Sequence, residues 1–111
     1  MEIQTPQQVI NELNRLQGLS EKGVEALYQA EVKLVEAENA FEVAFAKAIL
    51  KHEGGTAQVK EALAKLDTAE LKFAAQLARV ERDRVKSKLK QISEASVAAS
   101  VIGRQVELQF K

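Results

Sequence analysis

Few residues of this chain have the types and the spacing that catalysis needs. His52 is the only histidine, and it lies beside Glu53 and the paired glycines Gly54 and Gly55. A general base or a metal site there would need further ligands or an orienting partner, and the chain has no cysteine and no second histidine to supply one. We therefore expect His52 to be an exposed turn residue, and the chain to be no enzyme and to hold no metal or cofactor.

The other groups that could do chemistry are carboxylates. They are numerous, as at Glu36, Glu38 and Glu42, but the large side chains that would build a dry cleft around them are scarce. Neither a nucleophile-elbow motif nor a glycine-rich phosphate loop is present. Solvated acidic faces are the expected outcome.

The strongest local feature is a basic stretch over residues 79–90. It carries six positive charges against two negative ones, and its cations are Arg79, Arg82, Arg84, Lys86, Lys88 and Lys90. Three roles stay open for these cations: pairing with acidic residues of a preceding helix, binding a protein partner, or binding nucleic acid. The first is favoured because the 16 basic residues balance 16 acidic ones over the whole chain. Base-stacking aromatic residues are also absent from the stretch.

The elements that would position these residues are long helices. Aromatic residues make up only 5% of the chain, and the single proline is Pro6. We predict an all-α fold, a long antiparallel helical hairpin of coiled-coil type that self-associates into a bundle. The predicted parts are a helix over 6–52, a turn over 53–56, a helix over 57–102 and a tail over 103–111, all in one domain over 1–111.

The first predicted helix carries one seam of mostly small or apolar residues at alternating spacings of four and three. We call it the first seam: Val9, Leu13, Leu16, Ser20, Gly23, Leu27, Ala30, Leu34, Ala37, Phe41, Ala44 and Ala48. Gly18 could end one helix and Ser20 could cap another. The seam keeps its phase there, which favours one continuous helix, kinked or weakened at these glycines.

The second predicted helix carries a stripe at helical spacing that drifts from a strict heptad: Val59, Leu63, Leu66, Phe73, Leu77, Val85, Leu89 and Ile92. A hairpin centred between Gly54 and Gly55 would place residue n beside residue 109 minus n. Glu31 would then lie near Arg79, Glu25 near Arg84, and Phe41 by Thr68.

Three candidate interface residues lie on the first helix: Phe41 belongs to the first seam, and Phe45 and Ile49 extend its apolar face sideways. The C-terminal end adds Val106, Leu108 and Phe110, which alternate with polar residues after Gly103. This pattern predicts a short strand that pairs with another chain, or a frayed end. Because a lone hairpin covers only one seam, we also predict a dimer or a higher oligomer.

The segments 41–55 (FEVAFAKAILKHEGG) and 64–78 (AKLDTAELKFAAQLA) resemble small helical proteins of unassigned role that tailed bacteriophages encode near early or recombination genes. The resemblance covers roughly residues 24–107 and includes Ser100, Arg104 and Glu107 after the second helix. It implies a phage setting, a bacterial host cytoplasm, and an accessory role without catalytic residues.

The expected function is therefore protein–protein interaction through helical surfaces, with an unidentified phage or bacterial protein or a second copy of the chain as partner. Two alternatives stay open: a nucleic-acid accessory factor of phage recombination or replication that uses the basic stretch, and an inhibitor of a host enzyme or defence complex. Residues 1–6 do not contain a basic region followed by an apolar run, and no apolar run is long enough to span a membrane. We therefore expect no membrane partner and a cytoplasmic location.

Overall fold

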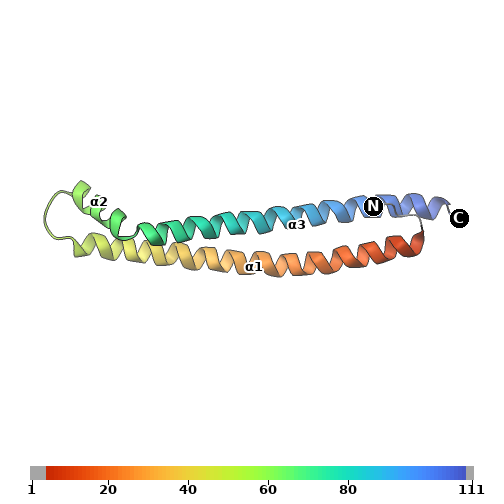
Figure 1. Ribbon diagram of the computed structural model, residues 1–111, viewed down its shortest axis with the longest axis horizontal. Helices are drawn as coiled ribbons and strands as arrows, with labels where there is room; N and C mark the ends of the chain where they lie inside the picture. The colour runs from red at the N-terminus through yellow and green to blue at the C-terminus, as the bar shows by residue number, and fades with distance from the viewer. Residues whose placement is uncertain (1–4, 110–111) are drawn as a thin grey trace. The chain divides into compact units, whose positions relative to one another are not determined.

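The computed structural model describes residues 5–109, which form three helices and no strand. Helix α1 spans Pro6–Lys51, α2 spans Ala57–Asp67 and α3 spans Ala69–Gln109 (Figure 1). One arm of the hairpin is α1, and the other consists of α2 followed by α3. The predicted all-α helical hairpin is confirmed.

The helix ends follow from local capping chemistry. Thr5 and Gln8 form a reciprocal capping box: the amide of Gln8 donates to Thr5 Oγ1 at 3.2 Å, and the amide of Thr5 donates to Gln8 Oε1 at 3.1 Å. Between the arms, Gly54 and Gly55 have φ values of 84° and 80°, a region that glycine adopts without strain. Thr56 then caps α2, because its Oγ1 accepts from the amide of Val59 at 3.3 Å.

The described residues group into two compact units. Unit 1 contains α1 up to Leu27 and α3 from Arg84 onward, and unit 2 contains Tyr28–Asp83. In each unit a segment of α1 pairs with a segment of the second arm. Both units use α1 and α3, and one domain over 1–111 stays a prediction.

The packing face of α1 is the first seam. Every one of its twelve positions is buried or half-buried, and Val9, Leu16, Ala30, Leu34 and Ala48 are the buried ones. Helix α1 also runs without interruption through Gly18 and Gly23, so the continuous helix is confirmed. A four-three spacing keeps a seam on one side of a helix, which is why the sequence predicts this face correctly.

The second arm of unit 2 packs differently, since small residues face α1. Ala64, Thr68 and Ala75 are at most 8% exposed. The large residues Leu66, Phe73 and Leu77 of the predicted stripe are between 53% and 75% exposed. In unit 1 the same stripe continues with half-buried residues: Val85, Leu89 and Ile92.

The second arm is also interrupted, which corrects the unbroken helix predicted from residue 57. At Thr68 the backbone has φ −110° and ψ 11°, and α2 ends there. The buried Thr68 hydroxyl donates to the carbonyl of Ala64 at 2.7 Å, a bond that commonly bends helices. The hydrogen-bond ladder resumes at once, because the amide of Lys72 donates to the carbonyl of Thr68 at 3.0 Å.

The predicted tail over 103–111 is wrong for its described part, since α3 continues to Gln109. Gly103 does not release the chain from the helix but lets α1 approach closely. A Cβ on Gly103 would lie 2.8 Å from Val9 Cγ1. Ala99 and Val106 are buried on the same side at helical spacing, so packing against α1 outweighs the low helix propensity of glycine.

Candidate interaction surfaces

Six exposed large apolar side chains of unit 2 form one line along α2 and α3. Starting at Val59, positions spaced alternately by four and three residues give a set that we call the outer stripe: Val59, Leu63, Leu66, Glu70, Phe73, Leu77 and Val80. Its six apolar members are all between 38% and 75% exposed. Only Glu70 interrupts the apolar character. The outer stripe therefore has the spacing of a coiled-coil seam without a partner helix.

The outer stripe lies on the side of the second arm opposite α1. With 3.6 residues per turn, the buried positions 64, 68 and 75 point about half a turn away from positions 66, 73 and 80. Helix α1 therefore leaves the outer stripe uncovered. The four-three spacing of the outer stripe is present in the sequence. The stripe predicted for the second helix left out Val80 and continued from Leu77 to Val85, so it did not separate this face.

The basic stretch extends over both compact units. Arg79 and Arg82 belong to unit 2, while Arg84, Lys86, Lys88 and Lys90 belong to unit 1. Arg79 donates to Glu38 Oε1 at 2.6 Å, and this hydrogen bond raises the pKa of Arg79. Pairing with the first helix is thus observed at Arg79, but the predicted partner Glu31 is wrong.

Arg79 meets Glu38 rather than Glu31 because the two helices are positioned differently relative to the turn than the prediction assumed. The pairs Arg79 with Glu38, and His52 with Asp67, join residues whose numbers add up to 117 and 119. A tight turn at Gly54 and Gly55 would give 109. The loop extends from His52 to Thr56, so these two ion pairs lie about two turns from the predicted position. In unit 1, the contacts of Gly23 with Leu89 and of Val9 with Gly103 both add up to 112, which is about one turn from it.

The other cations of the basic stretch have different surroundings. Arg82 is paired with its neighbour Asp83 at 2.7 Å, and Arg84 also has an interaction within the chain. Lys86, Lys88 and Lys90 are exposed and form no ion pair within residues 5–109.

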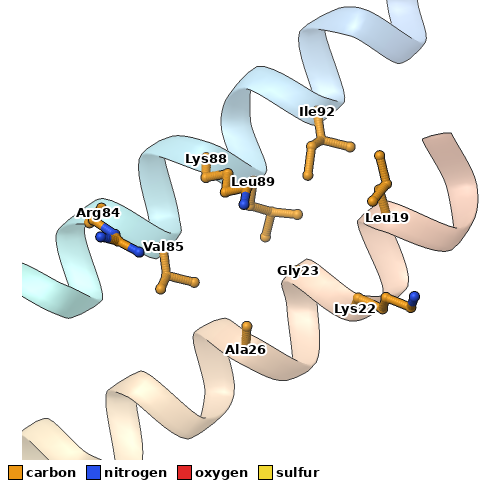
Figure 2. A pocket seen from close by; sticks show the side chains of 9 residues that line it. All are labelled: Leu19, Lys22, Gly23, Ala26, Arg84, Val85, Lys88, Leu89 and Ile92. Carbon is orange, nitrogen blue, oxygen red and sulfur yellow. The ribbon is translucent and has the colours of Figure 1, made fainter.

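Arg84 and Lys88 line a groove of about 290 Å³ between the two arms of unit 1 (Figure 2). Val85 and Leu89 point from α3 toward α1, where they meet Gly23 and Ala26 (Figure 2). A Cβ on Gly23 would lie 2.8 Å from Leu89 Cδ1, so the glycine makes room for this leucine. The remaining lining residues are Leu19, Lys22 and Ile92. The groove is thus apolar at its base, with cations at its edge.

The predicted interface residues of α1 are partly covered. Phe41, Phe45 and Ile49 are half-buried, and the two rings meet edge to face with centroids 5.9 Å apart. At the C-terminal end, Val106 is 5% exposed and Leu108 is 71% exposed. They do not share an apolar edge, because residues two positions apart in a helix point to different sides of it. Phe110 lies outside the described residues.

His52 is not the free turn residue that the sequence predicts. Its Nε2 lies 2.6 Å from Asp67 Oδ2, and its side chain is 23% exposed. The pair joins the end of α1 to the end of α2. No group of three metal-binding side chains occurs among residues 5–109, and none of the helices described there is both long and apolar enough to cross a membrane.

The chain matches no protein-family model, and searches of curated proteins and of solved structures find no significant similarity. The resemblance to helical phage proteins has no counterpart in these comparisons and stays an expectation.

Proposed function

We propose that this protein is a non-enzymatic interaction module that binds other protein chains through exposed helical surfaces. One observation carries the proposal: the outer stripe exposes six apolar side chains at heptad spacing on the side opposite α1. Burying a side chain such as leucine or phenylalanine contributes about 1.5 to 3 kcal/mol. A second helix on the outer stripe would therefore recover burial that the hairpin leaves unused.

Site-specific photo-cross-linking tests this function. A photoreactive amino acid replaces Leu77 on the outer stripe or, as the control, Val35 on α1, which is 65% exposed and lies outside the stripe. In cells that produce the protein, we expect cross-links to protein chains from position 77 and few from position 35. Equal yields at both positions, or none at either, would contradict the proposal.

Nucleic-acid binding is a second candidate, supported by the exposed Lys86, Lys88 and Lys90. If these lysines neutralise phosphates, affinity for DNA or RNA falls steeply as salt rises, because counterions are released on binding. Replacing all three with glutamine should then abolish binding without changing the melting temperature. Affinity that is unchanged by both salt and the substitutions would exclude this role.

A further inference from the structure

We infer that the outer stripe is covered by the outer stripe of a second copy of this chain, with the two stripes antiparallel. The inference rests on the proposed function and deepens it by naming the partner and its orientation.

The pattern of the outer stripe supports a second copy as the occupant. Spacings of four and three alternate on both sides of Glu70, so the stripe reads almost the same in both directions. A two-fold axis near Glu70 places Leu66 of one copy near Phe73 of the other, and Leu63 near Leu77. Such a contact is isologous, meaning that one surface serves both partners.

Charge complementarity selects the antiparallel orientation. Glu70 does not choose between the orientations, because a two-fold axis near residue 70 brings the two glutamates together just as a parallel pair in register does, and two carboxylates repel each other in either case. In a parallel pair in register, Lys60 of one copy and Glu81 of the other would lie at opposite ends of the stripe. In the antiparallel pair, Lys60 of one copy flanks Glu81 of the other on the edge of the stripe, and the pairing occurs twice. Glu81 also has an interaction within its own chain, and a carboxylate can accept several hydrogen bonds.

The segment of α1 that belongs to unit 2 does not obstruct this contact. The residues that face α1 in unit 2, Ala64, Thr68 and Ala75, are on the other side of the second arm. The stripe spans 22 residues, from Val59 to Val80, over α2 and the start of α3 with the interruption at Thr68 between them, and a rise of 1.5 Å per residue gives it a length of about 33 Å. Three heptads with one polar position are enough for a modest, concentration-dependent dimer rather than a permanent one.

Sedimentation equilibrium of the purified full chain is the first test. We expect a reversible monomer–dimer equilibrium. Val80→Glu should raise the Kd for dimerisation at least about a hundredfold, because a two-fold contact loses apolar burial on both sides. The matched control is Val35→Glu, since Val35 is 65% and Val80 64% exposed. It should leave the Kd within about threefold of wild type.

Circular dichroism should show the same helix content in all three proteins. A monomer at every concentration, or equal effects of both substitutions, would overturn the inference.

Orientation is tested with single cysteines, for which the cysteine-free chain is a clean background. We expect an oxidised mixture of Lys60→Cys and Glu81→Cys proteins to give the mixed disulfide in preference to either symmetric one. Residues 60 and 81 are about 30 Å apart along one arm, so this bond can form only between copies. Predominance of the symmetric products would indicate a parallel pair and refute the proposed orientation.

Photo-cross-linking at position 77 separates the two levels of the proposal. Cross-links to a second copy support both. Cross-links only to other proteins, together with a monomeric purified chain, would overturn self-pairing and leave the proposed function standing. No cross-links at all would remove the proposed function.

Discussion

At the scale of single residues, several charged pairs within residues 5–109 join side chains at most four positions apart in the sequence. Glu12 and Arg15 are the clearest case: Nε of Arg15 donates to Glu12 Oε2 at 2.9 Å across one helical turn. This hydrogen bond lowers the pKa of Glu12 below its ordinary value. A depressed carboxylate pKa stabilises the fold at pH values above the ordinary pKa. That contribution is lost as the pH falls through the lowered pKa of the folded state.

Replacing Arg15 with glutamine should therefore return the pKa of Glu12 toward its ordinary value. NMR titration of the Glu12 side-chain carboxyl in both proteins measures this directly. Above the ordinary range of glutamate, Arg15→Gln should slightly lower the melting temperature, and in strong acid the two proteins should melt alike. An unchanged titration curve for Glu12 would contradict the geometry of the pair.

The partner of Arg79 gives a second prediction at this scale. Glu38→Gln removes the acceptor that Arg79 uses, so it should lower the melting temperature slightly. Glu31→Gln, which alters the partner expected from the tight-turn hairpin, should have a smaller effect. The melting temperatures of both variants are measured at low and at high salt. Salt screens an exposed ion pair, so the loss caused by Glu38→Gln should shrink at high salt. A larger loss for Glu31→Gln would favour the tight turn instead.

At the scale of helices, three helical glycines differ in what surrounds them. A Cβ at Gly18 meets nothing within 4 Å, whereas one at Gly23 meets the end of the Leu89 side chain. At Gly103 it meets Val9 Cγ1, which belongs to a stiff, buried residue. Gly18→Ala should stabilise the protein by about 0.5 to 1 kcal/mol, because alanine has the higher helix propensity.

Gly23→Ala should gain less, because Leu89 must move, and Gly103→Ala should be destabilising. Urea unfolding of the three variants measures this order. A stabilising Gly103→Ala would mean that the close approach of Val9 has no energetic consequence.

The packing faces of the two arms differ in how well the sequence predicts them. The first seam was predictable, because α1 has only one line of residues at four-three spacing that is free of charges. The second arm has two candidate faces, a small one with Ala64, Thr68 and Ala75 and a large one with Phe73 and Leu77. Periodicity alone cannot choose between them, since both repeat at helical spacing. Small residues allow backbones to approach closely, and this preference depends on the partner helix.

Among the candidate interface residues, half-burial of the pair Phe41 and Phe45 beside the first seam followed from spacing. The prediction for the C-terminal end was wrong, because it treated Gly103 as the residue at which the helix ends. Its role depends on Val9, which is more than 90 residues away in sequence. A contact of that range leaves no local trace in the sequence.

At the scale of the whole molecule, Glu70 controls how strongly two copies would associate. It is the single charged position in the outer stripe, and a polar residue in a seam fixes the alignment of the helices at a cost in stability. Glu70→Leu should therefore lower the Kd for dimerisation at least about tenfold and increase the population of other alignments. Sedimentation measures the affinity, and the cysteine pairs measure the alignment. Weaker association of Glu70→Leu would show that Glu70 makes a favourable contact between copies.

The loop at Gly54 and Gly55 also has a consequence for how the chain folds. Contacts near it, such as His52 with Asp67, join residues 15 apart, whereas Val9 and Gly103 are separated by most of the chain. Closing a short loop costs less entropy, so the two arms should zip together from the loop outward. Gly55→Ala, which strains a φ of 80°, should then mainly slow refolding. Gly103→Ala should mainly speed unfolding. In stopped-flow kinetics, the ratio of the change in folding activation energy to the change in stability should be near one for Gly55→Ala and near zero for Gly103→Ala.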